Sequence, residues 1–340
     1  MMPLVRTIAA FCFSALLLYG ISSNLVLAAV FINGRKVFNS IPFYIIAYQM
    51  IVCDFFIYIA QAVVVIPSLL LDAKAAAQYT SWQHHSLLAS FDSIGSYAAL
   101  HFTFLIVCNR LAVFLSPKIS ALFINRRILF VWILFTWLFS IALTVFEYFT
   151  CPKTFNAVGI YLYYGCEKNC SSIGLQKAFT HSITVWGYLL PAVMFVCYVY
   201  IFICVKRVRQ TSLPKLSTTT ERSVIQDSGT LRNARKSISM ALKIRFSKKD
   251  PEVSTIMQAG LICGILELQT LIFFLFPIFS RCLPPKYGVY LNIVQNCTII
   301  LSNSMGPLIF YCFNSEIKMR AERILHCQKT RKISTVGCAR

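Results

Sequence analysis

Seven long apolar runs, separated by polar segments, dominate the pattern of hydrophobic and polar residues along the chain. An α-helix needs about 20 residues to cross a hydrocarbon core roughly 30 Å thick, and every run is long enough. We therefore predict an all-α membrane protein whose residues 1–313 form a bundle of seven transmembrane helices. The predicted spans are 7–32, 41–71, 86–109, 128–150, 178–205, 254–280 and 287–313.

The composition agrees with this pattern. Of the 340 residues, 57% are hydrophobic and 13% are charged, which is too apolar for a soluble globular protein of this size. A secretory signal peptide is the alternative interpretation of the first run, because Arg6 precedes it. The run is long for a signal peptide and contains Gly20 and Asn24, which are typical of helix contacts, so we favour a span.

The basic residues indicate the orientation in the membrane. Of the 32 Lys and Arg residues, 25 lie in 33–40, 110–127, 206–253 and 314–340. The positive-inside rule places these segments in the cytoplasm and the amino terminus outside the cell. The net charge of +20 then reflects topology and attraction to anionic membrane lipid. Nucleic-acid binding is rejected, because the basic residues lie in loops and no nucleic-acid-binding module accompanies them.

Two segments extend beyond the predicted bundle. Residues 206–253 are basic and rich in Ser and Thr, so we expect a cytoplasmic loop whose ends continue the fifth and sixth helices. The cytoplasmic tail, 314–340, begins with a stretch that places Ile317, Ile324 and Leu325 on one helical side. This pattern predicts a short amphipathic helix lying on the inner leaflet. Cys327, at its end, is a candidate palmitoylation site.

The segments assigned to the outside contain residues suited to an oxidising, secretory environment. Asn169 begins an Asn-Cys-Ser glycosylation sequon, whereas Asn296 begins a matching sequence inside the seventh span, where we expect no modification. Disulfides among the outer cysteines are expected, although their pairing cannot be read from the sequence. The candidates are Cys151, Cys166, Cys170 and Cys282.

Landmark residues in most of the spans resemble those of the rhodopsin-like G-protein-coupled receptors, in order and spacing over nearly the whole chain. Three stretches, NRLAVFLSPKISALF, IMQAGLICGILELQ and GPLIFYCFNSEIKMR, look most like nematode chemosensory serpentine receptors of class X. The resemblance implies that a small chemosensory molecule binds outside the cell and that a heterotrimeric G protein is activated inside it. The landmarks are Asn24, Asp54, Asn109-Arg110, Pro117, Trp132 or Trp137, Pro191, Pro277 and Pro307.

The same resemblance implies roles for two groups of residues. Residues that couple to the G protein or switch conformation would be Asn109, Arg110, Pro277, Pro307 and Tyr311. An intramembrane polar hub would consist of Asn24, Asp54, Ser302 and Asn303. In the family, a residue like Asp54 helps to hold a sodium ion and water. A protonated carboxyl group that only organises hydrogen bonds is the alternative for Asp54.

Asp92 and Tyr97 are the candidate ligand-binding residues. Asp92 precedes Arg110 by eighteen residues, which places it roughly 27 Å further out on the same helix face. This arrangement resembles aminergic receptors, in which such an aspartate pairs with the ammonium group of the ligand. The alternative is an aspartate at the helix entry that faces the outer headgroups.

The chain also departs from the family pattern. Asn109 stands where an acidic residue usually precedes the arginine, so Arg110 lacks its local salt-bridge partner. Glu267, in the sixth span, is an alternative partner for Arg110 or Asp54. Gly306 replaces an asparagine of the seventh span. No cysteine lies between Cys53 and Cys108, so the outer end of the third span has none for the usual disulfide to the second outer loop.

The sequence gives little support to catalysis. The five histidines do not form a metal-binding pattern, and no phosphate-binding loop or nucleophile elbow is present. A membrane transporter or ligand-gated channel is the alternative function. It would need charge along a continuous path, whereas Asp54, Asp92 and Glu267 lie at separate depths. We therefore predict a plasma-membrane receptor without catalytic residues or cofactors, except for a candidate sodium ion near Asp54.

Overall fold

The apolar runs form helices because, in lipid, backbone polar groups must be hydrogen-bonded within their own segment. The computed structural model describes residues 2–81, 83–156, 158–165, 173–224, 251–282, 284 and 287–325. Six of its helices are long and apolar enough to cross a membrane, and a seventh long helix contains the shorter apolar stretch Met257–Ile272. The predicted seven-helix fold is confirmed.

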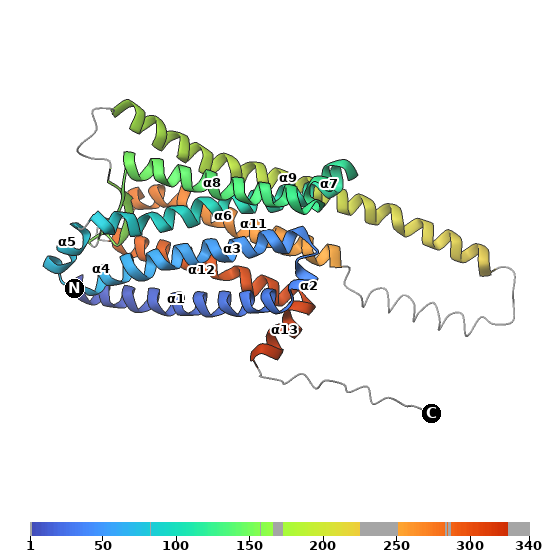
Figure 1. Ribbon diagram of the computed structural model, residues 1–340, viewed down its shortest axis with the longest axis horizontal. Helices are drawn as coiled ribbons and strands as arrows, with labels where there is room; N and C mark the ends of the chain where they lie inside the picture. Colours follow the sequence, from blue (N-terminus) through green and yellow to red (C-terminus); the bar gives the residue numbers. More distant parts are fainter. Residues whose placement is uncertain are drawn as a thin grey trace.

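The seven segments lie side by side in one bundle (Figure 1). The second segment is continuous but changes from α-helix to π-helix, and the fifth extends well past residue 205, into the predicted loop 206–253. Residues 225–250 of that loop lie outside the described residues. The segments are α1 (Met2–Asn33), α3 (Pro42–Ala60) with η1 (Gln61–Val65) and α4 (Ile66–Leu70), α6 (Gln83–Leu115), α8 (Arg126–Thr150), α9 (Ile173–Val224), α11 (Pro251–Cys282) and α12 (Gly288–Phe313).

Shorter elements mark the two ends of the bundle. The helix α5 (Ala73–Ser81) and a β-hairpin lie at the same end as the amino terminus, which we call the hairpin end (Figure 1). The helices α2 (Arg35–Phe38), α7 (Pro117–Ile124) and α13 (Ser315–Leu325) lie at the opposite end, which we call the α13 end.

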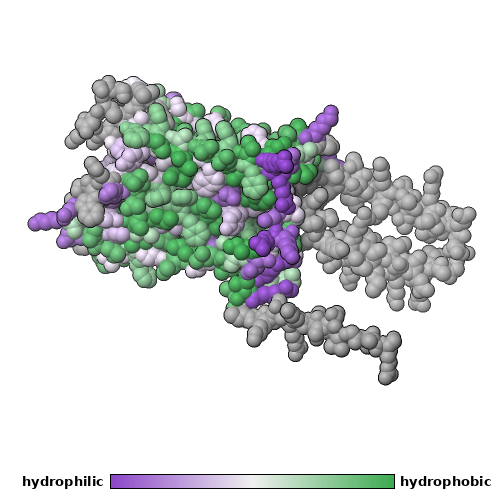
Figure 2. Space-filling model, viewed as in Figure 1, coloured by the Kyte–Doolittle hydropathy of each residue, from purple (hydrophilic) through white to green (hydrophobic). Residues whose placement is uncertain are grey.

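The surface of the bundle fits a membrane environment. Figure 2 shows an apolar surface over the middle of the bundle and a hydrophilic band towards the α13 end. The helices that meet at the α13 end expose several basic side chains, as expected for a surface that meets lipid headgroups. They are Arg35, Lys36, Lys118, Arg126, Arg127, Lys318 and Arg323.

The hairpin was not anticipated from the sequence. Strands β1 (Lys153–Asn156) and β2 (Tyr161–Tyr164) pair antiparallel, with Lys153 opposite Tyr164. Ile160, in the turn, has a φ of 59°, which is strained for a β-branched residue. Its side chain is fully buried, and its carbonyl accepts a hydrogen bond from Asn296 Nδ2 (2.9 Å). The bundle therefore holds the turn in a conformation that it would otherwise avoid.

The second segment widens into a π-helical turn close to a proline. Pro67 has no N–H group, so the carbonyl of Val63 loses its regular helical partner. The hydroxyl group of Tyr79, from α5, donates a hydrogen bond to that carbonyl instead. Arg6 of α1 donates to the carbonyl of Leu71 (2.8 Å), at the end of α4. Side chains from two other helices therefore stabilise this irregular segment.

Close packing fixes α3 against its neighbours. A Cβ atom at Gly95 of α6 would lie 2.7 Å from the carbonyl oxygen of Cys53, so only glycine permits this approach. Trp137 of α8 donates its indole N–H to Gln49 Oε1 of α3 (3.0 Å), whereas Trp132 is 42% exposed. Of the two tryptophans that fitted the family pattern, Trp137 therefore faces the bundle.

Candidate functional site

A cavity of about 670 Å³ lies at the hairpin end of the bundle. Side chains from η1, α6, α8, α9, α11 and α12 line it, together with residues of the hairpin. Its volume is within the range of small-molecule sites in proteins. Both candidate ligand-binding residues, Asp92 and Tyr97, lie on its wall.

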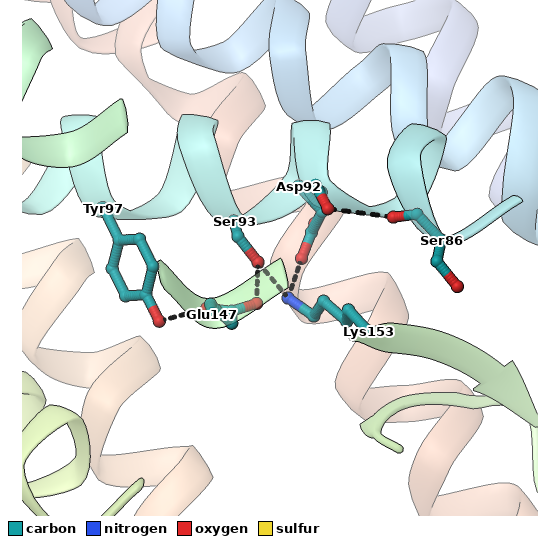
Figure 3. Close-up of polar contacts among 7 residues, drawn as sticks. Ser86, Asp92, Ser93, Tyr97, Glu147 and Lys153 are labelled. Carbon is teal, nitrogen blue, oxygen red and sulfur yellow. Dashed lines mark hydrogen bonds and ion pairs between the residues drawn. The ribbon is translucent and has the colours of Figure 1, made fainter. Parts of the chain in front are cut away.

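Asp92 is paired with a lysine of the hairpin. Lys153 Nζ lies 2.5 Å from Asp92 Oδ2, and the two side chains are 13% and 10% exposed. Lys153 Nζ also donates to Ser93 Oγ (3.4 Å) (Figure 3). Burial alone would lower the pKa of Lys153, but the attraction of Asp92 is part of what raises it above its ordinary value. Asp92 therefore faces the interior of the protein, and the headgroup-facing interpretation is wrong.

A second buried carboxyl group belongs to the same cluster. Glu147, near the end of α8, is 2% exposed and accepts hydrogen bonds from Ser93 Oγ (2.6 Å) and Tyr97 Oη (2.5 Å) (Figure 3). Sequence reasoning missed both Glu147 and Lys153. A signal for Glu147 was available, because it is the one acidic residue in the fourth span, and an intramembrane carboxyl group is a functional candidate by default.

The hairpin is fastened to the bundle at both of its ends. At its base, Lys153 reaches Asp92 of α6. At its turn, Asn292 Nδ2 of α12 donates to the carbonyl of Gly159 (2.6 Å), and Asn296 bonds Ile160 as described above. Asn296, which matched a glycosylation sequon, therefore has a structural role inside the bundle. The hairpin forms part of the cavity wall and is not free to move away from it without breaking these contacts.

The cysteine expectations are met in part. Cys151, just before the hairpin, is disulfide-bonded. Cys282 is a free, exposed thiol, so this candidate takes no part in a disulfide. The remaining candidates for modification or pairing lie outside the described residues. These are Cys166, Asn169, Cys170 and Cys327.

The predicted polar hub surrounds a second, smaller cavity of about 60 Å³ in the middle of the bundle. Asn24, Asp54, Ser302 and Asn303 all line it. Ser302 donates to Gln269 Oε1 of α11 (2.6 Å), so this hydroxyl does not supply the polar contact expected at Asp54.

Two further side chains complete this hub. Asn24 Nδ2 donates to Tyr58 Oη (3.1 Å), which in turn shares a hydrogen bond with Ser304 Oγ (3.1 Å). Asn24 Oδ1 and Asn303 Nδ2 are buried and have no hydrogen-bond partner among the residues that the structure describes. An amide oxygen beside a carboxyl group is the type of ligand that a hard cation prefers. The residues present therefore fit a small ion with water.

Arg110 lies against an aromatic ring at the α13 end. Its guanidinium carbon is 4.4 Å from the ring centre of Phe43, a fully buried residue of α3. The ring of Phe43 lies 5.8 Å from that of Phe310 in α12. Glu267, the alternative partner, instead approaches Cys263 Sγ of its own helix (4.0 Å). Arg110, which follows the uncharged, buried Asn109, therefore makes a cation–π contact with Phe43.

The helix α13 is held at its start by Asn314. The side-chain oxygen of Asn314 accepts hydrogen bonds from the backbone N–H groups of Glu316 and Ile317, both at 3.1 Å. This is an N-cap, which satisfies backbone donors at a helix start. Asn314 Nδ2 also donates to Tyr44 Oη of α3 (2.5 Å). The cap therefore ties the start of α13 to the bundle.

The structure also shows the surroundings of the other residues singled out in α11, α12 and α13. Tyr311 Oη donates to Glu322 Oε1 of α13 (3.2 Å). Ile317 is buried, but Leu325 is 61% exposed, so Leu325 does not share the buried side of the helix. Pro307 is buried inside α12, and Pro277 lies within α11.

We compared the chain and its fold with known protein families and solved structures. A protein family described as a protein of unknown function (DUF621) matches residues 4–228. The chain belongs to this family. The search of curated proteins found no match. Among solved structures, the crystal structure of squid rhodopsin is similar, with a TM-score of 0.68 and 14% identity over 97% of this chain and 89% of that chain. This DUF621 protein therefore has a rhodopsin-like fold and is a multi-pass membrane protein.

The family match includes the site residues of the first five helical segments and the hairpin, but not those of α11 and α12. It includes Asp92, Glu147 and Lys153, and also Arg110 with Phe43. The α11 and α12 residues of both cavities lie beyond residue 228. The ionic cluster at the hairpin end therefore lies within the part of the chain that matches the family.

Proposed function

We propose that this DUF621 protein is a G-protein-coupled receptor that binds a small chemosensory ligand at the hairpin end and activates a heterotrimeric G protein at the α13 end. One observation carries the proposal: a rhodopsin-like bundle has a cavity of about 670 Å³ beneath a fastened hairpin. The resemblance of three sequence stretches to nematode class X receptors supports the chemosensory assignment. No part of this proposal requires catalysis.

The proposed orientation places the hairpin outside the cell and the exposed basic residues of the α13 end in the cytoplasm. In this orientation the protein resides in the plasma membrane, Asn169 receives a glycan, and Cys327 is available for palmitoylation. Protease protection in sealed microsomes tests the orientation, since the segment 206–253 should be cleaved from the cytoplasmic side. Protection of this segment inside the lumen would contradict it.

In this proposal a ligand acts by changing the contacts of Asp92 and Tyr97. Lys153 already contacts Asp92 Oδ2, so a cationic group that binds this oxygen would have to displace Lys153. The ligand shifts the equilibrium only to the extent that it binds the active arrangement more tightly than the resting one. A ligand that releases Lys153 would therefore loosen the hairpin and the adjoining part of α6.

The α13 end would respond through helix movement. Arg110, next to Asn109, would exchange its contact with Phe43 for the G protein, and Pro277 and Pro307 would allow α11 and α12 to bend, because a proline removes one helical hydrogen bond. Tyr311 would part from α13. A sodium ion held by Asp54 and Asn24 would favour the resting arrangement.

Nucleotide exchange tests the proposed function. The purified protein in lipid nanodiscs is combined with a panel of heterotrimeric G proteins and screened with odorants and metabolites. We expect at least one combination to accelerate exchange, and Arg110→Ala to abolish the effect at equal protein density. Ligand-gated current or tracer uptake without any G protein would overturn the proposal in favour of a channel or transporter.

A further inference from the structure

Gln61 has an unusual environment within the large cavity. It is the first residue of the π-helical turn η1, its side chain is 0% exposed, and it lines the cavity. Neither its amide nitrogen nor its amide oxygen has a hydrogen-bond partner in the described part of the protein. Buried polar groups are nearly always hydrogen-bonded, so two unsatisfied atoms on one side chain require an explanation.

The fold holds Gln61 in this position from several sides. The π-helical turn begins at Gln61 and contains the Val63 carbonyl that Tyr79 stabilises, so α5 supports the turn. The contact between Gly95 and Cys53 brings α6 close to the second segment. Asp92, about one turn before Gly95 in α6, lines the same cavity. π-Helical turns occur often at functional sites, where they redirect a side chain.

His85 provides a contrast within the same end of the protein. It is 2% exposed, and among the described residues neither of its ring nitrogens has a hydrogen-bond partner. Its ring packs edge-on against that of Tyr79, with 5.4 Å between the centroids, and His85 does not line the cavity. Gln61 therefore differs from His85 in its place: its unsatisfied donor and acceptor belong to a side chain on the cavity wall.

We propose that the side chain of Gln61 is a ligand contact that binds an amide group. A glutamine amide presents two N–H donors and one carbonyl acceptor in a plane. A carboxamide or lactam offers the complementary donor and acceptor side by side, so the two amides can form a cyclic pair of hydrogen bonds. Aromatic side chains on the same cavity wall, including Tyr97, Tyr188 and Phe276, provide flat surfaces for the rest of such a ligand.

This inference rests on the proposal that the large cavity is the ligand site, but it does not depend on G-protein coupling. Its test therefore measures binding rather than signalling, so that failure of the amide contact can be distinguished from failure of the receptor function. The probes are benzamide and two analogues of similar shape without an N–H donor, acetophenone and N,N-dimethylbenzamide. Binding is measured by ligand-observed NMR on the full chain in nanodiscs.

We expect benzamide to bind the wild-type protein at least about tenfold more tightly than either analogue, because the analogues leave a buried acceptor unpaired. Gln61→Met, which keeps the length of the side chain, should remove this preference. Gln295→Met is the matched control, because Gln295 lines the same cavity but is only half-buried, and here the preference should remain.

Four results would overturn the proposal: no detectable binding of benzamide, equal binding of all three probes, a preference that survives Gln61→Met, or a preference that disappears in Gln295→Met. The thermal unfolding midpoint without probes is a second measurement. If Gln61 has no structural partner, Gln61→Met should unfold at the same or a higher temperature than the wild type. A lower midpoint would show that the amide serves the fold instead of a ligand.

Discussion

The two ends of the bundle hold their key charged residues in different ways. At the hairpin end, Asp92 and Lys153 form a buried ion pair, and Glu147 accepts two hydrogen bonds beside it. At the α13 end, Arg110 lies on the face of Phe43. Removing one partner of a buried ion pair strongly destabilises the folded protein, because the other charge stays buried without a partner. A cation–π contact contributes only about 0.5–2 kcal/mol to stability. The hairpin end is therefore suited to hold a fixed cavity, and the α13 end to change its contacts.

Among the proposed variants, breaking the ion pair between Asp92 and Lys153 should change the free energy of unfolding most. Lys153→Met leaves Asp92 buried without its partner, so we expect the free energy of unfolding to fall by about 3–5 kcal/mol. The double variant Asp92→Leu/Lys153→Met should recover most of this loss, because apolar residues of similar size remove both charges. Thermal unfolding in detergent measures both, with Lys118→Met at the exposed surface as the control.

The pH dependence of this pair follows from the raised pKa of Lys153. A lysine with a raised folded-state pKa contributes fully below its unfolded value, about 10.5, and the contribution is lost as the pH rises through the folded value. Stability from the pair should thus be constant through neutral pH. If the single variant Lys153→Met unfolds within about 0.5 kcal/mol of the wild type, the pair is unimportant for stability.

Part of this comparison was accessible from the sequence and part was not. The seven helices follow from runs of apolar residues, and α13 from the spacing of Ile317 and Ile324, because both signals are local. The resemblance to known receptors directed attention to Arg110 and Asp54. The hairpin was missed because its two strands have four residues each and lack a strong turn signal, and its turn places a strained isoleucine where glycine is usual.

The ionic cluster was missed for a different reason. Lys153 and Glu147 reach α6 residues that are 50 to 61 positions away in the sequence. Such contacts depend on how helices pack, which no local pattern reveals. Asp92 alone suggested an empty carboxylate for a ligand, and only the fold showed that Lys153 already occupies it.

A smaller effect is expected at the aromatic contact of Arg110. Phe43→Leu removes the ring under the guanidinium group, which weakens the resting state by about 1 kcal/mol and raises basal nucleotide exchange roughly fivefold. Phe310→Leu is the matched control, because it removes a ring of the same aromatic cluster that does not lie under Arg110. Equal increases in both variants would mean that general packing, and not the cation–π contact, restrains the arginine.

Adding a carboxylate at position 109 should lower basal nucleotide exchange, the opposite of the effect of Phe43→Leu. Asn109→Asp places an acidic group beside Arg110, and a charge-assisted contact formed only in the resting state should lower basal exchange by a few-fold, about 1 kcal/mol. The assay is the same, at equal protein density. If basal exchange rises instead, the new carboxylate does not restrain Arg110.

The most local effect is expected on hydrogen exchange at the start of α13. Asn314→Ala removes the N-cap and the bond to Tyr44, so we expect a local loss of about 1 kcal/mol. Hydrogen exchange followed by mass spectrometry should show faster exchange in residues 315–319. Asn125→Ala is the matched control, because Asn125 caps α8. It should accelerate exchange at the start of α8 and leave α13 unchanged, and an unaltered α13 in Asn314→Ala would disprove the role of the cap.

The central claim is that the cavity at the hairpin end controls Arg110 at the α13 end. Basal nucleotide exchange by the charge-free double variant Asp92→Leu/Lys153→Met, with and without Arg110→Ala, tests it most directly. We predict that the double variant exceeds the wild type, because its hairpin is no longer fastened by charge, and that adding Arg110→Ala abolishes the increase. Exchange that stays at the wild-type level in the folded double variant, or an increase that persists without Arg110, would contradict the claim.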